Sequence, residues 1–452
     1  MSTQSVSADG RMFSNRELRN LIAPLVVEQT LTFMVGVADS MMVSYAGEAA
    51  MSGVSLVDMY VVMVNTILAA IGGGGAVVVS QYIGSRDRER ANRSAGQLIL
   101  LAALISTALM IFTLSFHTGI LHLFYRSVQP DVMAAAEKYI VLTAFSYPFL
   151  GIYNSSTALF RSMEKTSRTM MVSLIMNVIN VTGNAIGIFV LHAGVAGVAV
   201  PTVVARITAG LLMSGMAFSR KNEIFLEWKN ILSWHRDTIR RILHIAVPNG
   251  IENGLFTLGR ILVTSIVSLF GTSQIAASSA ALSVGTIAII VCSGNNLAIV
   301  TVVGQCVGAG EYDQAAYYTK KILKISYIGN FIMMCIMQLF LAQILGLYEL
   351  TPEGYRYAWL LVTIHNVGAC FIHPTSFNLA NGLRATGDAR YTMVVGMVSM
   401  LIFRVGAAVL FGIVLNFQVL GVWFAMLSDW MARSAAFILR FRSGAWRNYR
   451  AI

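Results

Sequence analysis

Charged side chains are scarce in this sequence, and their scarcity indicates which class of protein it encodes. Only 12% of the 452 residues are Asp, Glu, Lys or Arg, while 56% are hydrophobic. A soluble domain carries about 25% charged residues. Residues 170–191 and 325–345 contain no charge and are long enough to cross a bilayer, which takes about 20 residues. An ordinary soluble fold is therefore excluded. An all-α polytopic membrane protein is indicated, because the strands of a barrel would be short and alternating.

The sequence also lacks the motifs of enzymes and of resident metal ions. Its four cysteines form no CxxC pair and its seven histidines show no HExxH spacing, so neither a disulfide framework nor a metal centre is indicated. The run Ile71–Gly75 (IGGGG) looks like a phosphate loop, but the Lys-Ser/Thr that such a loop needs does not follow it. We therefore expect no cofactor and no enzyme activity.

We expect twelve membrane spans, near 21–45, 51–82, 95–117, 139–158, 170–191, 194–218, 242–270, 275–305, 322–347, 357–381, 391–414 and 418–439.

Basic residues outnumber acidic residues, with 32 Lys and Arg against 21 Asp and Glu. Loops on one side then carry 25 Lys and Arg, and loops on the other carry Arg126, Lys138 and Arg356. The positive-inside rule places both termini in the cytoplasm, in a multi-pass protein of the cell's inner membrane. The net charge of +11 is thus a topology signal, and no nucleic-acid partner is expected.

The two halves of the sequence repeat one another at an offset of 224 residues. The repeated positions include Pro24 and Pro248, Glu28 and Glu252, Gly47 and Gly271, Gln81 and Gln305, Gly84 and Gly308, Ala91 and Ala315, and Gly197 and Gly421. Arg161 and Arg384 differ by 223. Each half holds six spans, and an even number returns the chain to the same side, so the repeats are parallel.

The repeat sets the expected domains. Residues 1–218 form an amino-terminal six-helix lobe, 219–241 a cytoplasmic linker, and 242–452 a carboxy-terminal six-helix lobe. The linker mixes basic residues with Trp228 and Trp234, which predicts an amphipathic helix at the membrane interface. A monomer is expected, because two fused repeats already supply the interface of a dimer.

Ionisable residues inside spans are functional candidates, since a charge near the bilayer centre costs at least about 2.5–3.5 kcal/mol. The expected spans contain Glu28, Asp39, Asp58, Glu252, Asp429, Arg206, Arg260, Arg404 and Arg433. Asp429 and Arg433 are four residues apart on one helix face and can neutralise each other. Asp58 lies near the outer end of its span, where it can reach water.

Asp39 has no basic residue within one helical turn, and its counterpart in the repeat is Val263. An unpaired carboxylate there either takes up a proton or holds a cation, with a purely hydrogen-bonded structural role as the alternative. One face of the fifth span adds three amides, Asn177, Asn180 and Asn184. Their oxygens can coordinate a hard cation or bind substrate, or they can serve helix packing. Thr202 adds a hydroxyl from the sixth span.

Glu28 and Glu252 lie at the same depth in both halves, so they have either a shared scaffold role or a role in gating or substrate binding. Arg260 and Arg404 lie deep in the second half and need partners, for which Glu252 is a candidate.

These features together resemble the multidrug and toxic compound extrusion (MATE) family. The resemblance spans essentially the whole chain. Its carriers are Pro24, VADSMMVSYAG around Asp39, the strings SQYIGSRDRERA and GQCVGAGEYDQAA, and the loops LFRSMEKTSRTM and GLRATGDARYTM. The resemblance implies twelve helices in two lobes around a central cavity, and alternating access. It also implies export of amphipathic, often cationic compounds against influx of Na⁺ or H⁺.

The resemblance further implies a coupling-cation site in the amino-terminal lobe, formed at Asp39, Asn180, Asn184 and Thr202, with Na⁺ at Asp39 as one candidate. Asn184 stands where a second Asp is common, so one negative charge is missing and the choice between Na⁺ and H⁺ stays open. Acids that some members carry in the carboxy-terminal lobe are absent here: Asn378 occupies the tenth span, and Glu252 lies closer to its helix start. Asn378 is instead a candidate for substrate binding or gating, as are Arg260 and Arg404.

The resulting prediction is a cation-coupled antiporter in the lipid bilayer that exports small amphipathic, cationic drugs or toxic compounds. One alternative is a flippase for lipid-linked precursors, in which Arg260 and Arg404 would hold a pyrophosphate. A membrane enzyme is a second and weaker alternative.

Overall fold

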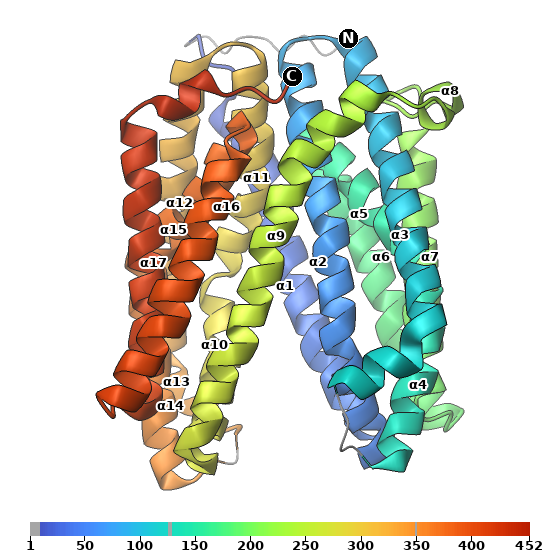
Figure 1. The fold of residues 1–452 in the computed structure, drawn as a ribbon. Coiled ribbons are helices and arrows are strands. Elements are labelled where there is room, and N and C mark those ends of the chain that lie inside the picture. Colours follow the sequence, from blue (N-terminus) through green and yellow to red (C-terminus); the bar gives the residue numbers. More distant parts are fainter. Residues whose placement is uncertain (1–9, 125–128, 349) are drawn as a thin grey trace. The chain divides into compact units, whose positions relative to one another are not determined.

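The computed structural model describes residues 10–124, 129–348 and 350–452, and this part of the chain contains helices and no strand (Figure 1). Arg126, one of the three basic residues expected on the outer side, lies outside the described residues. The α-helices are α1 Asn15–Ser44, α2 Glu48–Gly84, α3 Arg88–Phe124, α4 Pro130–Ala144, α5 Tyr147–Ser162, α6 Thr166–Ala185, α7 Ala196–Ala217, α8 Trp228–Leu232, α9 Arg236–Val267, α10 Thr272–Ala288, α11 Ile290–Gly308, α12 Tyr312–Leu339, α13 Leu341–Leu345, α14 Pro352–Phe371, α15 His373–Thr386, α16 Ala389–Ser399 and α17 Gln418–Arg442. Three π-helical segments are η1 Ile186–Val190, η3 Met400–Gly406 and η4 Val409–Val414, and two 3₁₀ segments are η2 Ser268–Phe270 and η5 Ala445–Asn448.

Every predicted span falls on helix, although several spans are divided between two helices. Nine of the described helical segments are long and apolar enough to cross a membrane. Two further spans are broken where a proline follows, between α4 and α5 before Pro148 and between α14 and α15 before Pro374. Proline is tolerated in the first turn of the new helix, because the N–H that it lacks would have no partner there. The last span, α17, carries Asp429 and Arg433 within its apolar stretch.

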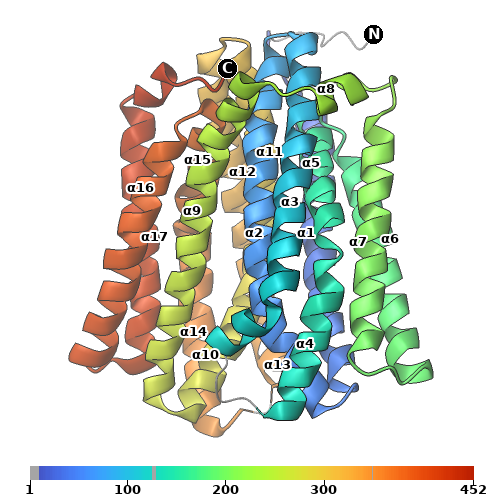
Figure 2. The same cartoon turned by 45° about the vertical axis from the view of Figure 1, so that its right-hand side comes forward.

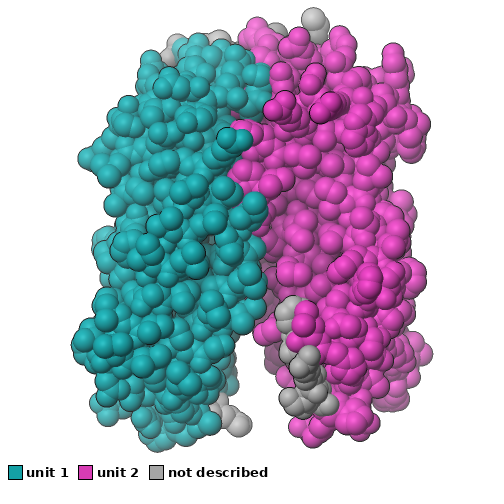
Figure 3. Space-filling view, in the orientation of Figure 1, with its two compact units in different colours: residues 1–18, 251–452 teal, residues 19–250 magenta. Residues whose placement is uncertain are grey.

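The chain divides into two compact units, Met1–Leu18 with Ile251–Ile452, and Arg19–Gly250 (Figure 3). The boundary falls inside α9, two residues after Pro248. The beginning of the described chain belongs to the unit that holds the second repeat, where the Phe13 N–H donates to the Tyr318 hydroxyl at 2.8 Å. The boundaries of the two lobes that the sequence repeat predicts stay a prediction.

Within unit Arg19–Gly250, α2 packs against α3, α4 and α5, and α6 packs against α7 (Figures 1 and 2). Glycine permits the close approach of α7 to the end of α6. A Cβ atom on Gly197 would lie 2.6 Å from the carbonyl oxygen of Gly187. Small residues of this kind take the place of the hydrophobic effect in membrane helix packing, because lipid is as apolar as leucine.

Within the other unit, α10 packs against α14, α11 against α12 and α15, and α17 against α15, η3 and η4. The equivalent glycine contact recurs there. A Cβ atom on Gly421 would lie 2.6 Å from the carbonyl oxygen of Phe411. The duplicated glycine therefore marks the same helix crossing in both repeats.

The linker prediction is wrong in its extent. Helix α8 covers only Trp228–Leu232, and residues 218–227 form turns and irregular chain. The side chains of α3 account for this, because the Gln97 amide donates to the carbonyl oxygens of Asn230 and Ser233 and accepts from the His235 N–H. These bonds replace the helical hydrogen bonds that a continuous helix would need.

Packing at Gly197 yields a stability prediction. Gly197→Ala would push a methyl group against the Gly187 carbonyl, and overpacking of this kind costs about 1–3 kcal/mol. We expect a lower midpoint of thermal unfolding in detergent. Gly215→Ala on the same helix is the control, since nothing lies within 4 Å of its Cβ position. Equal midpoints for the two variants would contradict the packing argument.

Candidate functional site

The four residues predicted for the cation site lie together in unit Arg19–Gly250. Asn184 on α6 donates to the Asp39 Oδ1 atom of α1 at 2.9 Å, and it lies 3.4 Å from the Asn180 Oδ1 atom. The Asn180 side chain is 3.0 Å from the Thr202 hydroxyl of α7. Asn184 is fully buried and Asn180 is 7% exposed, so the amides form the inner wall of the site.

The Asn180 amide satisfies its hydrogen bonds with its nitrogen toward Asp39. In this orientation it donates to both carboxylate oxygens at 2.8 and 2.9 Å, while its oxygen accepts from the Thr202 hydroxyl at 3.0 Å. The Asp39 carboxylate therefore accepts from the amides of both Asn180 and Asn184.

The sequence accounts for this local arrangement. Asn180 and Asn184 are four residues apart, so both amides lie on one face of α6. Gly183 sits between them, and a Cβ atom there would lie 2.5 Å from the Cβ atom of Pro201. The missing side chain lets α7 approach α6, which brings Thr202 within reach of Asn180.

Asn177 does not join this cluster. It lies on the same helix and is 8% exposed, and its Nδ2 atom has no hydrogen-bond partner among the described residues. The structure therefore supports two of the three predicted amides as neighbours of Asp39.

A second acidic residue extends the site beyond what the sequence reading identified. The Tyr139 hydroxyl donates to the Asp58 Oδ1 atom at 3.3 Å. Arg206 interacts electrostatically with both Asp39 and Asp58, and its guanidinium donates to the Ser146 hydroxyl at 3.0 Å. Asp58 is exposed, as its place near a span end predicted. Arg206 was the available signal, since a lone basic residue inside a span needs an acidic partner.

Glu28 and Glu252 form matching buried ion pairs, one in each repeat. Arg161 lies 2.5 Å from Glu28, whose other carboxylate oxygen accepts from the Thr169 hydroxyl at 2.9 Å. These contacts join α1, α5 and α6. A carboxylate held by an arginine and a hydroxyl is satisfied, which favours the scaffold role over gating.

In the second repeat, Arg384 lies 2.7 Å from Glu252, and Arg433 lies 3.6 Å from its other oxygen. Arg433 also forms the predicted pair with Asp429, at 3.0 Å. The proposed pairing of Glu252 with Arg260 or Arg404 is wrong, because α15 and α17 supply its arginines instead.

Asn378 belongs to a packing network and has no contact with an acid. Its amide nitrogen donates to the Cys292 carbonyl and to Asn296, each at 2.9 Å, and its oxygen accepts from the Cys292 thiol. These contacts join α15 to α11, and Asn378 is fully buried. Its contacts favour a structural role over substrate binding.

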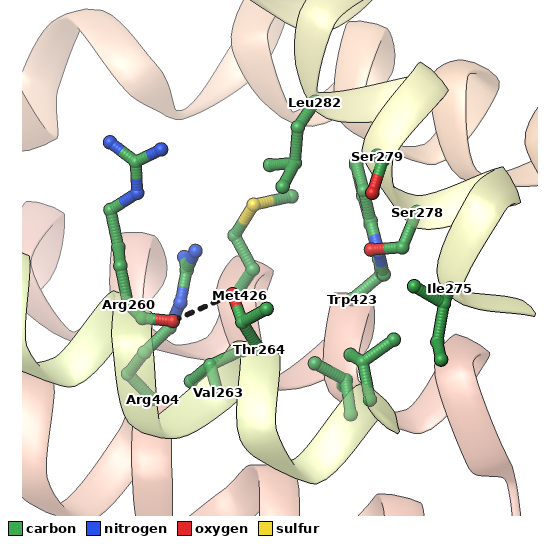
Figure 4. A pocket seen from close by; sticks show the side chains of 12 residues that line it. Arg260, Val263, Thr264, Ile275, Ser278, Ser279, Leu282, Arg404, Trp423 and Met426 are labelled. Carbon is green, nitrogen blue, oxygen red and sulfur yellow. Dashed lines mark hydrogen bonds between the residues drawn. The ribbon is translucent and has the colours of Figure 1, made fainter. Parts of the chain in front are cut away.

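Arg260 and Arg404 line a pocket of about 70 Å³ in unit Met1–Leu18 with Ile251–Ile452 (Figure 4). In the view, the two arginines lie on one side, and Ser278 and Ser279 lie on the other. The remaining lining is mainly apolar and includes Trp423.

The ligand atoms available to a cation at Asp39 are oxygen atoms. The described residues contain no group of three His, Cys, Asp or Glu side chains that could hold a metal ion. Asp39 offers one carboxylate, and Asn180 and Thr202 offer neutral oxygens. Oxygen donors of this kind suit a hard cation, and a single carboxylate balances one positive charge.

Loss of the Glu252 carboxylate should destabilise the fold. Glu252→Gln leaves Arg384 and Arg433 buried with less counter-charge, and breaking such a pair costs about 3–5 kcal/mol. We expect a large fall in thermal unfolding midpoint. The control is Glu353→Gln, at an exposed position in the first turn of α14, where an effect below about 1 kcal/mol is expected. A small loss for Glu252→Gln would refute the scaffold role.

Known proteins resemble this chain along its whole length. The family model described as MatE matches residues 24–186 and 248–410, one match in each half. The chain is 25% identical to "Uncharacterized transporter YisQ" of Bacillus subtilis, over 95% of this chain and 94% of that protein. It is also 25% identical to "Probable multidrug resistance protein NorM" of Thermotoga maritima, with coverages of 95% and 93%.

A solved structure described as an "Outward-facing conformation of a multidrug resistance MATE family transporter of the MOP superfamily" shares the fold. Its TM-score is 0.89 at 18% identity, with 95% of this chain and 96% of that chain covered. The all-helical fold with two repeated halves is thereby confirmed. The chain belongs to the MatE family, the multidrug and toxic compound extrusion family of multi-pass membrane transporters, and it is not an enzyme.

Proposed function

We propose that this protein is an antiporter of the inner membrane that exports small amphipathic compounds against influx of Na⁺ or H⁺. The observation that carries the proposal is the Asp39 site, where a single carboxylate meets Asn180 and Asn184. Relatives named for multidrug resistance support export of drug-like compounds. The positive charge of one set of loops supports cytoplasmic termini.

The contacts of Asp39 give the coupling cation a physical means of acting. The carboxylate accepts N–H donors from Asn180 and Asn184, and a proton or Na⁺ that binds Asp39 competes with these donors. A coupling ion shifts a conformational equilibrium only if it binds one state more tightly. Asn180 contacts both Asp39 on α1 and Thr202 on α7, so ion binding at Asp39 alters the contacts between these helices.

The flippase alternative is not favoured, because the matches are to the MatE family and to proteins named for multidrug resistance. The basic pocket around Arg404 bears on the charge of the exported compound.

Asp39→Asn should abolish coupling while the protein still folds. The substitution removes the charge that a proton or Na⁺ neutralises, and the new amide keeps nearly the same shape. The measurement is gradient-driven movement of one cationic and one anionic fluorescent amphiphile in proteoliposomes, under a Na⁺ gradient and a pH gradient imposed separately. Asp131→Asn on α4, at an exposed position, is the matched control and should transport normally. Unchanged transport by Asp39→Asn would rule out the assignment.

Asn184→Asp should strengthen dependence on Na⁺. The Asn184 nitrogen lies 2.9 Å from Asp39, so a carboxylate there would face a second carboxylate. Two like charges at this distance repel unless a cation binds between them. We expect at least a tenfold lower Na⁺ concentration for half-maximal transport, measured in the same vesicles. No change in the Na⁺ requirement would argue that the ion binds elsewhere.

A further inference from the structure

Two arginines in the carboxy-terminal half lack a counter-charge of their own. Arg404 is 6% exposed, and its Nε and Nη1 atoms have no hydrogen-bond partner among the described residues. Arg260 on α9 interacts with it electrostatically by repulsion. Buried guanidinium groups are normally paired, because an unpaired buried charge is costly. Arg404 is therefore a buried cation whose guanidinium can accommodate a further hydrogen-bond acceptor.

The nearby acids form no hydrogen bond to Arg404 in the described structure. Glu252 is bound by Arg384 and Arg433. The Oδ1 atom of Asp429 is bound by Arg433 and by the Ser399 hydroxyl at 2.6 Å, while its Oδ2 atom has no hydrogen-bond partner among the described residues. Asp429 attracts Arg404 electrostatically, but no hydrogen bond joins the two side chains in the described structure. Four arginines thus share two carboxylates, and the excess positive charge lies at Arg260 and Arg404.

Both excess charges line the same pocket. Its volume of about 70 Å³ is enough for several water molecules and so for a small head group. Hydroxyl groups of Ser278 and Ser279 also line it, and so does that of Thr264, which donates to the Arg260 carbonyl at 3.0 Å. Ser278 is positioned by the Trp423 indole, which donates to its oxygen at 3.3 Å. Figure 4 shows the Ser278 and Ser279 hydroxyls across the pocket from the guanidinium groups.

The pocket is the repeat counterpart of the Asp39 site with its polarity inverted. At the repeat offset of 224 residues, Asp39 corresponds to Val263, Asp58 to Leu282 and Thr202 to Met426, and all three counterparts line the pocket. Apolar residues thus replace both acids and the hydroxyl.

Arg404 corresponds to Asn180 at the same offset. The offset is 223 between Thr169 and Thr392 and 224 between Gly197 and Gly421, so one residue is inserted between these points, and at an offset of 223 Arg404 corresponds to Val181. Two π-helices lie in this interval: η3, which contains Arg404, and η4. A π-helical turn accommodates an added residue, and such turns often occur at functional sites.

We propose that this pocket binds the carboxylate or phosphate group of an amphipathic anion that the transporter exports. The proposal rests on the transport function proposed above and names its substrate class. Guanidinium groups bind such oxyanions through paired, charge-assisted hydrogen bonds, and the hydroxyl groups add further donors. A cationic head group meets only repulsion from Arg260 and Arg404, so the predicted preference for cationic compounds does not hold at this pocket.

Binding to the purified full-length protein in a neutral detergent tests the proposal without an ion gradient. The probes are octanoate and octyl phosphate, with octanamide and octylammonium as matched neutral and cationic probes, measured by calorimetry. We expect the anions to bind at least tenfold more tightly than octanamide. Equal binding of octanoate and octanamide would overturn the proposal.

Arg404→Gln should weaken octanoate binding by about tenfold or more, because a charge-assisted bond is lost. Arg260→Gln, at an exposed position, should weaken it too and keeps the test open if the Arg404 variant fails to fold. Arg356→Gln, an exposed arginine on α14, is the control and should bind normally. Unchanged octanoate affinity in the Arg260 and Arg404 variants would also overturn the proposal.

Thermal unfolding separates a binding role from a structural one. Arg404→Gln removes an unpaired buried charge, so without ligand its unfolding midpoint should equal or exceed that of the unmodified protein. Loss of an arginine with a structural role would lower the midpoint instead. Asp39→Asn should keep octanoate binding, so failure of coupling and failure of the anion site are distinguishable.

A final comparison identifies the source of the anion. Nanodiscs of phosphatidylcholine alone and with phosphatidylglycerol are compared for octanoate binding, and octanoate uptake is measured in vesicles. Export of octanoate supports the proposal. Competition by phosphatidylglycerol, together with no octanoate movement, would overturn the substrate assignment and assign the pocket to a lipid head group.

Discussion

A charged side chain inside a low-dielectric interior must be neutralised, and this constraint organises both halves of the transporter. The duplicated pairs of Glu28 with Arg161 and of Glu252 with Arg384 meet it fully. Each pair ties the first helix of its repeat to two later helices, so neutralisation and helix packing are achieved by the same contacts. Because these pairs neutralise their own charges, the carboxylates and arginines that remain elsewhere in the interior stand out as candidate sites for ligands.

The remaining charges differ in sign between the halves. The amino-terminal half keeps Asp39 and Asp58 beside Arg206, and the carboxy-terminal half keeps Arg404 and Arg260 beside a pocket. At the repeat offset the acids Asp39 and Asp58 correspond to the apolar residues Val263 and Leu282, and Arg404 supplies the charge in the second half. A scaffold contact must persist in both copies to hold the helices together, whereas a ligand site can diverge without loss of the fold. This physical difference explains why Glu28 is repeated and Asp39 is not.

Backbone contacts set the geometry of both sites. Gly183 and Gly197 allow α6 and α7 to approach closely, which places two amides and a hydroxyl within hydrogen-bond distance. In the second repeat, the interval that gains one residue contains the π-helices η3 and η4, and Arg404 lies in η3. The small residues and the one inserted residue thus determine which side chains come into contact, although they contribute no functional group to either site.

Composition, hydropathy and the 224-residue repeat were sufficient to predict the all-helical membrane class and the two repeated halves, and the resemblance to the MATE family implied the candidate roles of Asp39, Asn180, Asn184 and Thr202. These features are local or periodic, so they can be read along the chain. The partners of Glu252, the part played by Arg206, the short α8 helix and the pocket at Arg404 required the tertiary structure. The residues concerned lie on helices far apart in sequence. Arginines such as Arg384, Arg433 and Arg260 can be distinguished only by the helix packing, which determines which of them reaches a carboxylate. The sequence by itself therefore determined which charges had to be buried, and the fold decided which of them would be paired.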